Sequence, residues 1–333
     1  MRAEYLVTGA TGFVGRRLAE RLVAMGAGVR LLVRRPEKLP PQLSAACEVI
    51  VGDLGDPASL DAAVAGVGVV FHCAANVRTW DRWSAYEAAN IHGVENLIGA
   101  VVRCNPDLQR FVHLSSVDVY GFPEAPVDET ATLAKVDFPY GESKRQGEVC
   151  LRRIAQQHGI PYTILRPTNI VGPRSPFIER IGNELMSGLM LTVDGGSAHA
   201  GLLHVDNLID YMHWAAFSEL SVNETFNARD RCDVSWGGFI DDLRALIGGR
   251  GRVIDLPFIA ANAAANALAM LYRALPLTGE PMLHPLIVRI FGRTCGHSAD
   301  KLWSKSNMEA RVSYENAMAE SAAWFLDGKL RGQ

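Results

Sequence analysis

The chain has 333 residues, of which 48% are hydrophobic and 21% are charged, and its formal net charge is −3. These values are typical of a globular protein with a sizeable core, built as one large domain or two interlocked ones, and they exclude extended disorder. The slight negative charge and the lack of a long basic stripe argue against nucleic acid as a partner.

Strands and helices alternate along the predicted secondary structure. Buried strands are predicted at Glu4–Thr8, Val29–Val33, Val49–Leu54, Val67–Ala75 and Phe111–Ser116, with helical stretches between them. This alternation favours a parallel sheet with right-handed crossovers, in which ligands bind at the carboxyl ends of the strands. We therefore expect an α/β fold, a Rossmann-type doubly wound parallel sheet, followed by a smaller, mainly helical C-terminal substrate domain.

A glycine-rich turn follows the first strand and leads into a helix. Gly9 can adopt the dihedral angles of a tight turn, Gly12 lets the backbone approach a pyrophosphate, and Gly15 lets the helix pack against the strand. The pyrophosphate would sit at the N-terminus of that helix. The glycines are spaced three and three rather than two and three, and an ordinary strand-to-helix turn has the same appearance. In the context of the later strands, the turn predicts a dinucleotide site that comprises Gly9, Thr11, Gly12, Phe13, Val14 and Gly15.

Two further groups fall at predicted strand ends. Asp53, followed by Leu54, could bond the adenine amino group, and the small side chains of Ala74 and Ala75 would leave room for the ribose and phosphate. Alternatively, Asp53 caps a helix near Asp56, and the two alanines only pack.

The residue that ends the second strand bears on cofactor choice. An acid at this place accepts a hydrogen bond from a ribose 2′-OH, whereas a base pairs with a 2′-phosphate. Here it is Arg34, with Arg35 and Lys38 nearby, which favours NADP over NAD. The competing interpretation is a pair of solvated surface arginines.

Tyr140 and Lys144 are four residues apart, which places both side chains on one face of a helix. A nearby ammonium favours the phenolate, so Tyr140 could exchange a proton with a carbonyl or alcohol oxygen. Ser116 would hydrogen-bond the same oxygen and hold it opposite the nicotinamide. Lys144 would also hold the nicotinamide ribose, so that Tyr140 and Lys144 belong to the cofactor site as well. A Tyr and a Lys at this spacing are common in surface helices, and the upstream strand that ends in serines is what favours the catalytic interpretation.

Taken together, these motifs resemble the extended short-chain dehydrogenase/reductase family, within the NAD-dependent epimerase/dehydratase superfamily, over essentially the whole chain. The matching segments are Thr8–Gly15, Gly52–Leu54, His72–Ala75, Asn90 within Ala89–Gly93, Ser115–Gly121, Tyr140 with Lys144, Arg166–Pro173 and His204–Asp206. The resemblance implies that Ser116, Tyr140 and Lys144 form the catalytic triad and that Asn90 orders a proton-relay water. It also implies that Pro167 and Asn169 lie near the nicotinamide and substrate, and that the protein is a homodimer.

Two branches of this family differ in reaction class. One comprises reductases of bulky apolar alcohols and ketones, such as 3β-hydroxysteroid dehydrogenases and dihydroflavonol reductases, and the other comprises nucleotide-sugar epimerases and dehydratases. Arg34 resembles the NADP-using reductases, and Asp194–Leu203 lacks the arginine with which sugar-nucleotide enzymes grip the diphosphate. We therefore expect hydride transfer to or from a bulky, sterol-like substrate, with an epimerase or dehydratase as the alternative. A cofactor-sensing binding protein is a third class, disfavoured by the intact triad.

The stretch from Leu256 to Leu277 is long, alanine-rich and apolar. It resembles the C-terminal helix of the steroid-dehydrogenase branch, and we expect it to form a wall over the substrate or a plain packed helix. Peripheral contact with a membrane is a further alternative. A span is disfavoured because Asn262, Asn266 and Arg273 interrupt the stretch.

The cysteines and histidines indicate no special chemistry. Neither the six cysteines nor the nine histidines are spaced as metal ligands, so no metal site is expected. Unpaired thiols, and a first segment that already forms the cofactor strand, indicate a cytoplasmic protein without a signal peptide.

We expect residues 1–170 and about 201–231 to form the NADP-binding domain. Residues 171–200, predicted as a loop, and 232–333 would form the substrate domain.

Overall fold

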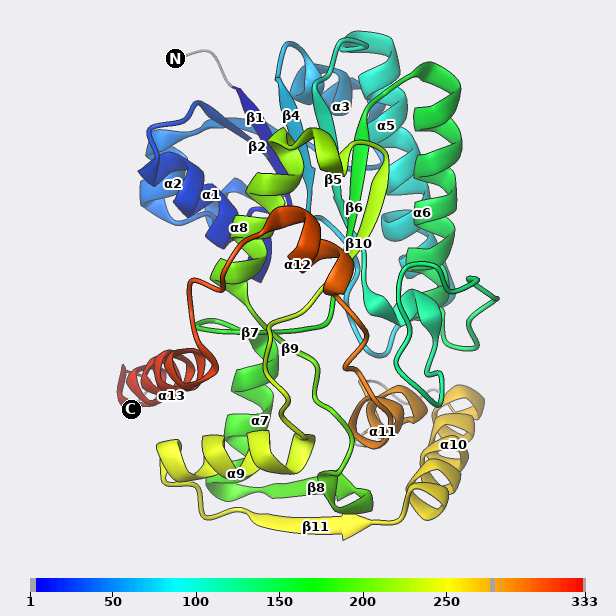
Figure 1. The fold of residues 1–333 in the computed structure, drawn as a ribbon, viewed down its shortest axis with the longest axis vertical. Helices are drawn as coiled ribbons and strands as arrows, with labels where there is room; N and C mark the ends of the chain where they lie inside the picture. The colour runs from blue at the N-terminus through cyan, green and yellow to red at the C-terminus, as the bar shows by residue number, and fades with distance from the viewer. Residues whose placement is uncertain (1–3, 276–278, 282, 332–333) are drawn as a thin grey trace.

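Seven parallel strands form the central sheet of the computed structural model, which describes residues 4–275, 279–281 and 283–331 (Figure 1). The strands, in their order across the sheet, are β10 (Glu224–Ala228), β6 (Tyr162–Pro167), β5 (Arg110–Leu114), β4 (Val69–His72), β1 (Tyr5–Thr8), β2 (Val29–Val33) and β3 (Glu48–Val51). The strand order reverses between β1 and β4. In open α/β sheets such a reversal opens a crevice at the carboxyl ends of the strands.

Helices cover both faces of this sheet. They are α1 (Phe13–Ala24), α2 (Pro41–Ala46), α3 (Pro57–Val64), α4 (Trp83–Tyr86), α5 (Gly93–Cys104), α6 (Pro139–His158), α8 (Val205–Phe217) and α12 (Asp300–Ser306). Successive strand residues enter different cores: Leu6 packs with residues of α3, α5 and α6, whereas Val7 packs with residues of α1 and α8. Because both faces are covered there, the central strands β1 and β4 are mainly apolar rather than alternating.

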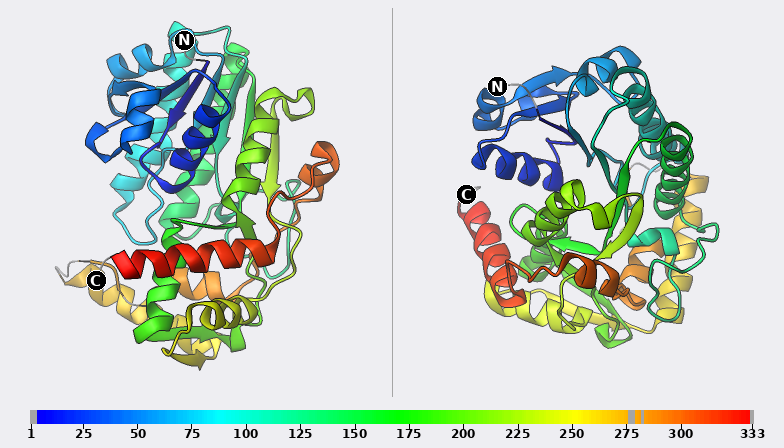
Figure 2. Two further views of the ribbon diagram at one scale, coloured as in Figure 1. Left: turned by 90° about the vertical axis from the view of Figure 1, so that its left-hand side faces the viewer. Right: turned by 45° about the horizontal axis from the view of Figure 1, so that its top comes forward.

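A second layer lies beyond the carboxyl ends of the strands, in the lower half of Figure 1. It contains α7 (Pro176–Ser187), β8 (Leu189–Val193), α9 (Trp236–Ile247), β11 (Arg252–Leu256), α10 (Phe258–Ala274), α11 (Pro285–Gly292) and α13 (Tyr314–Arg331). Strands β8 and β11 pair in parallel, and β7 (Asn169–Val171) pairs with β9 (Leu202–His204) between the two layers. Figure 2 shows α13 lying across this layer, where it contacts α7 and α9.

The fold class predicted from the sequence is confirmed, and one segment differs from its prediction. Residues 171–200, predicted as a loop, contain the helix α7 and the strand β8. Ile178, Ile181 and Leu185 follow helical spacing and are buried in the lower core. The surrounding Gly, Pro and Ser residues masked this short periodicity. In the apolar stretch that contains α10, Pro276 and Leu277 lie outside the described residues.

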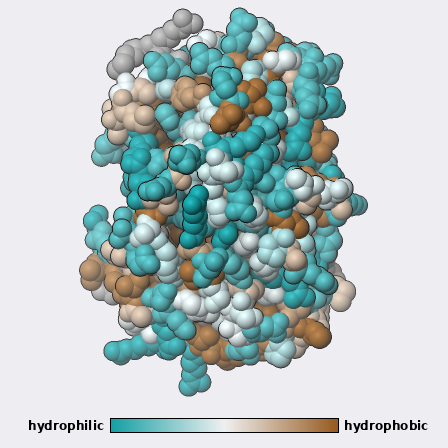
Figure 3. Space-filling model, viewed as in Figure 1, coloured by the Kyte–Doolittle hydropathy of each residue, from teal (hydrophilic) through white to brown (hydrophobic). Residues whose placement is uncertain are grey.

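The surface in the view of Figure 3 mixes polar residues with small, scattered apolar groups. On α10, Ile259 and Met270 are largely exposed. No described helix combines the length and the apolar character needed to cross a bilayer.

Candidate active site

The glycine-rich turn lies in the crevice between β1 and β4. Gly9 has a φ of 75°, and a Cβ there would lie 2.8 Å from the backbone nitrogen of Ala74. A Cβ on Gly15 would lie 2.4 Å from the carbonyl oxygen of Gly9, so the helix approaches the turn too closely for any side chain. Both glycines are therefore required by the backbone path itself.

Gly12 begins α1, and no side chain of the described residues caps the free N–H groups of its first turn. A Cβ there would meet only the Gly9 carbonyl, at 3.3 Å, so the other side of Gly12 is open. Thr11 beside it is exposed. An open helix N-terminus with uncapped N–H groups fits a pyrophosphate. The side chains of Phe13 and Val14 are half-buried and pack on the core beneath α1, so only their backbone N–H groups are placed to meet a cofactor, which stays a prediction.

The other predicted cofactor residues lie at strand ends around this crevice. Ala74, with Ala75 after it, donates its backbone N–H to Thr8 Oγ1 at 3.2 Å, which ties the end of β4 to β1. Asp53 accepts a hydrogen bond from Gly55 N at 2.8 Å within its own loop. Helix α3 is capped by Asp56 instead, so the alternative role of Asp53 as that cap is excluded.

Arg34 follows β2 and lies beside Asp53. The Arg34 Nε and Asp53 Oδ2 atoms are 3.5 Å apart, and the arginine side chain is 73% exposed. Leu54, which follows Asp53 in the chain, packs against the helix α5 at Gly93. Its carbonyl oxygen accepts a hydrogen bond from the Asn96 side chain. The exposed guanidinium is thus available to an anionic group, in competition with one carboxylate.

Tyr140 and Ser116 meet at the carboxyl end of β5. Tyr140 lies in the first turn of α6, directly after Pro139, which has the fixed backbone angle favoured at a helix start. Burial and the nearby Asp118 carboxylate raise the pKa of Tyr140, while its hydrogen bond with Ser116 opposes this shift. The phenol is therefore a neutral proton donor at ordinary pH, already paired with the predicted serine.

Lys144 lies one turn after Tyr140 and is buried. Burial lowers the pKa of Lys144 to about 8, with Glu148 and Cys73 opposing this shift. In the part of the chain that the structure describes, its Nζ donates to the carbonyl oxygen of Leu114 at 2.6 Å and not to Tyr140. The structure thus brings Ser116 and Tyr140 together and holds Lys144 beside them.

Asn90 lies in a π-helical turn, Glu87–His92, between α4 and α5. Its side-chain Nδ2 donates to Ser143 Oγ at 2.9 Å and to the carbonyl of Asn76 at 3.0 Å, and its Oδ1 accepts from Asn76 N at 2.8 Å. A Cβ on Gly147 would lie 2.3 Å from the Asn90 carbonyl oxygen. The Asn90 side chain therefore ties the loop after β4 to α6, and its water-ordering role stays a prediction.

Pro167 and Asn169 lie where β6 ends and β7 begins. The Asn169 side chain donates to the Ala200 carbonyl at 2.6 Å, which holds β7 against the segment that leads into β9. Asn169 also bonds the thiol of Cys295, a buried residue near Asp118. These contacts bring Asn169 to the Ser116 side of the crevice.

Sequence reasoning missed Asp118, two residues after the predicted serine. Its Oδ2 lies 2.9 Å from Ser116 Oγ, and its backbone N–H donates to the same oxygen at 3.2 Å. Desolvation raises the pKa of Asp118 to about 6, although the bond with Ser116 opposes the shift. The signal available in the sequence was a single acid between Val117 and Val119, directly after the serines.

The Tyr140 ring packs against an apolar wall. It consists of Val136, Phe138 and Leu286, with Phe122 and Ile290 packed against them. Beside this wall lies a hollow of about 310 Å³, which Phe122 shares with residues of the lower layer. Those residues are Phe258, Asn262, Arg289 and Arg293, and Asp137 completes the lining. Hydrocarbon side chains thus border one side of the Tyr140 ring, next to a hollow that is lined mainly by polar residues.

The loop after β4 contributes a further side of the site. Trp80 packs on the imidazole of His284, with ring centroids 5.7 Å apart, and the Arg273 guanidinium lies 5.6 Å from its centre. Thr79 bonds Glu280 at 2.7 Å. This loop is therefore fixed to the lower layer, whereas Trp83 is more exposed.

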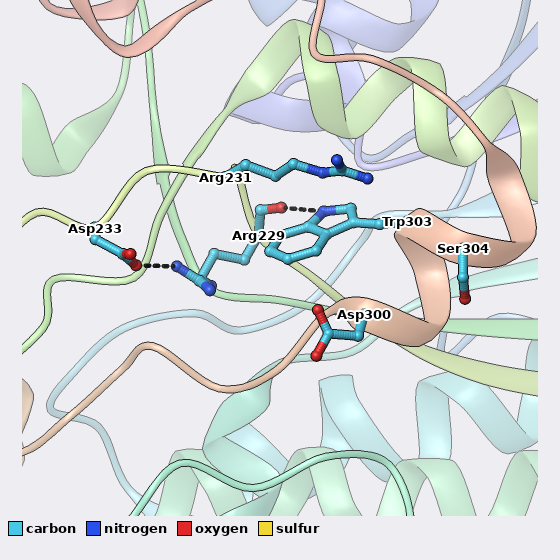
Figure 4. A pocket seen from close by; sticks show the side chains of 6 residues that line it. All are labelled: Arg229, Arg231, Asp233, Asp300, Trp303 and Ser304. Atoms are coloured by element: carbon cyan, nitrogen blue, oxygen red, sulfur yellow. Dashed lines mark hydrogen bonds and ion pairs between the residues drawn. The ribbon is translucent and has the colours of Figure 1, made fainter.

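A larger open hollow, of about 500 Å³, lies elsewhere, next to α12. Figure 4 shows Trp303 between the side chains of Arg229 and Arg231, with Arg229 paired to Asp233. None of the predicted site residues lines it.

Among the described residues no three His, Cys, Asp or Glu side chains are grouped to hold a metal ion.

Comparison with known proteins assigns the chain to a family. A family model described as the NAD dependent epimerase/dehydratase family matches residues 5–228, more than half of the chain. The chain belongs to this family. The resemblance drawn from the motifs is thereby confirmed, and this epimerase/dehydratase family member is an NAD-dependent enzyme of the oxidoreductase or epimerase type.

Relatives of this family member represent both reaction classes. It is 31% identical over 319 residues to the 4-hydroxy-2-methyl-3-oxo-4-farnesyl-3,4-dihydroquinoline-1-oxide ketoreductase of Stigmatella aurantiaca, covering 94% of this chain and 93% of that one. It is 26% identical over 262 residues to the N-acetyl-alpha-D-glucosaminyl-diphospho-ditrans,octacis-undecaprenol 4-epimerase of Escherichia coli O157:H7, covering 78% and 76%.

A solved structure of the UDP-glucuronic acid 4-epimerase from Bacillus cereus, with UDP-glucuronic acid and NAD, has the same fold. The TM-score is 0.75 at 21% identity, and the match covers 97% of this chain and 99% of that one. At this identity the likeness concerns the fold alone.

Proposed function

We propose that this protein transfers a hydride between a nicotinamide cofactor and the ketone or secondary alcohol of a bulky, apolar substrate. The observation that carries the proposal is the wall of Val136, Phe138 and Leu286 against which Tyr140 packs. A hydrocarbon wall favours an apolar body next to the reacting carbon, and a few polar groups then fix its orientation.

The polar groups of the site suit acid–base work on one substrate oxygen. The nicotinamide, when bound, supplies or accepts the hydride. Tyr140 gives its phenolic proton to the oxygen during reduction and takes it back during oxidation. Ser116 holds the same oxygen, and the Lys144 ammonium, anchored on Leu114 at 2.6 Å, stabilises the phenolate that reduction leaves.

Two further observations support the reductase branch over the epimerase branch. The segment Asp194–Leu203 contains no arginine to pair with a sugar-nucleotide diphosphate. The Stigmatella relative, matched over most of both chains, is a ketoreductase whose name describes a farnesylated substrate. A substrate of comparable bulk suits the apolar wall.

We also propose NADP as the preferred cofactor. The Arg34 guanidinium is exposed at the carboxyl end of β2, where it can meet a 2′-phosphate. Its present neighbour, Asp53 at 3.5 Å, is a loosely held surface partner that a phosphate can displace.

The test is the nicotinamide absorbance of the purified protein over time, with NADP or NAD, a panel of 3-hydroxy and 3-keto steroids and prenylated ketones, and sugar nucleotides. Net oxidation or reduction of the cofactor with an apolar ketone or alcohol is the expected result. A sugar nucleotide that is converted without net change in the cofactor would instead assign the protein to the epimerases.

A further inference from the structure

Asp118 and Ser116 are joined by two hydrogen bonds. Within the described residues, Ser116 Oγ is the one hydrogen-bond partner of the Asp118 carboxyl, at 2.9 Å. The same Oγ accepts the backbone N–H of Asp118 at 3.2 Å, because Ser116 caps the 3₁₀ turn Val117–Tyr120. Two groups of one residue therefore converge on the hydroxyl that the proposed reaction uses.

The capacity of that hydroxyl is limited. A serine Oγ has one proton and two lone pairs, and the Asp118 N–H occupies one lone pair. If Asp118 is a carboxylate, it can only accept, so it takes the single proton of Ser116. If Asp118 is a carboxylic acid, it donates to the second lone pair, and the Ser116 proton is left free for donation, either to the neighbouring Tyr140 oxygen or to a substrate oxygen.

The substrate oxygen needs that proton. A ketone oxygen has no hydrogen of its own, and negative charge develops on it during hydride transfer, so it must accept from both Tyr140 and Ser116. The reverse reaction passes through the same transition state and has the same requirement.

We propose that Asp118 is a positioning residue whose protonation state decides whether Ser116 can donate to the substrate oxygen, and that hydride transfer requires the neutral carboxyl. This inference rests on the proposed function.

The surroundings of Asp118 favour the neutral form. The groups that face it are the Tyr140 phenol on α6, the Cys295 thiol after α11 and, on its own turn, Ser116. None of these is a cation, and the Lys144 ammonium is turned to the Leu114 carbonyl. Desolvation raises the pKa of Asp118 to about 6, so the active form declines as the pH rises through that value. Burial raises the pKa of Tyr140 far above this range, so its proton is retained there.

The experiment measures kcat for ketone reduction between pH 5 and 8 in the wild type and in Asp118→Asn. In the wild type we expect kcat to fall about tenfold per pH unit above pH 6. The side-chain amide of the variant donates to Ser116 at every pH, so this fall should disappear while the cofactor Kd is unchanged. The same fall in both proteins would overturn the role of Asp118 and leave the proposed function intact.

Asp230→Asn is the matched control. Asp230 is also buried with a pKa raised to about 6, but it accepts from His204 N and the Asn207 side chain, away from Ser116. Its variant should keep the wild-type fall; loss of the fall in this variant would contradict the assignment to Asp118.

A second measurement uses the wild type and no substrate. Carbon-13 NMR of labelled aspartate carboxyls, with the Asp118 signal assigned from the variant, should show a titration near pH 6. A signal that stays ionised from pH 5 upward would overturn the inference even where reduction is observed. Because this readout is independent of turnover, it determines the protonation state of Asp118 even if no apolar ketone is reduced and the proposed function fails.

Discussion

Arg166 on β6 and Glu148 on α6 form a doubly bonded ion pair, with Nε–Oε1 and Nη2–Oε2 distances of 2.8 and 2.6 Å. The side chains are 2% and 0% exposed. Ser115, next to the proposed oxygen-binding serine, donates to the same carboxylate at 2.6 Å. The pair therefore fixes α6, which carries Tyr140, against the strand end that carries Ser116.

Replacement of Glu148 by Gln should destabilise the protein by about 3–5 kcal/mol, because it leaves a buried guanidinium without its counter-charge. The free energy of unfolding from chemical denaturation measures this effect. The exposed pair of Arg153 with Glu95, at 3.3 Å, is the control, and Glu95→Gln should cost only about 0–1 kcal/mol. Equal losses of unfolding free energy in the two variants would show that burial does not determine the cost of breaking an ion pair.

Loss of Lys144 should lower kcat far more than it weakens cofactor binding. In Lys144→Met, the ammonium that stabilises the Tyr140 phenolate is gone, and we expect kcat to fall about 10²-fold or more. Lys305→Met, which removes an ammonium paired with Glu224 at 3.1 Å away from the predicted site residues, is the control and should retain activity.

The charge of Lys144 also predicts a pH dependence. Burial lowers its pKa to about 8, so the ammonium is present below that pH and is lost as the pH rises through it. In the Asp118→Asn background, where the fall near pH 6 is removed, kcat should therefore decline above about pH 8. An activity that is constant from pH 7 to 9 in this variant would argue against a catalytic ammonium at Lys144.

Gly15→Ala should disrupt the cofactor turn. The added methyl group would lie 2.4 Å from the Gly9 carbonyl, so the turn or α1 must move. We expect NADPH to bind at least about tenfold more weakly, measured by fluorescence titration. Gly99→Ala lies within α5, where its Cβ would meet only the flexible end of Arg103 at 3.4 Å, and should leave binding unchanged.

Arg34→Ala tests the preference for NADP. Removal of the guanidinium should weaken NADP binding about tenfold, because the 2′-phosphate loses a charged donor, and should affect NAD much less. Arg103→Ala serves as the control. Arg103 is also a surface arginine, but it lies on α5 and pairs with Asp61 of α3 at 2.6 Å. A parallel loss of both cofactors in Arg34→Ala would contradict the assignment.

The elements predicted well from the sequence are those governed by local chemistry. The turn at Gly9–Gly15 depends on backbone angles and close approach, and the shared face of Tyr140 and Lys144 depends on helical spacing. The helix α7 was missed because its burial arises from the lower layer, which is formed by segments distant in the chain. Asp118 was missed for a similar reason. Its carboxyl meets Ser116 only because the chain folds into the 3₁₀ turn at Val117–Tyr120.

The core beneath α1 combines segments far apart in the chain, and this has a consequence for synthesis on the ribosome. Leu31 and Phe71 on one face of the sheet share one buried core with Leu208 and Met212 of α8, and all four side chains are fully buried. A nascent chain that has emerged only to residue 170 therefore leaves part of the apolar sheet without its covering helix α8. Such a species is prone to aggregation. The nucleotide-binding half is thus completed only after most of the message has been translated.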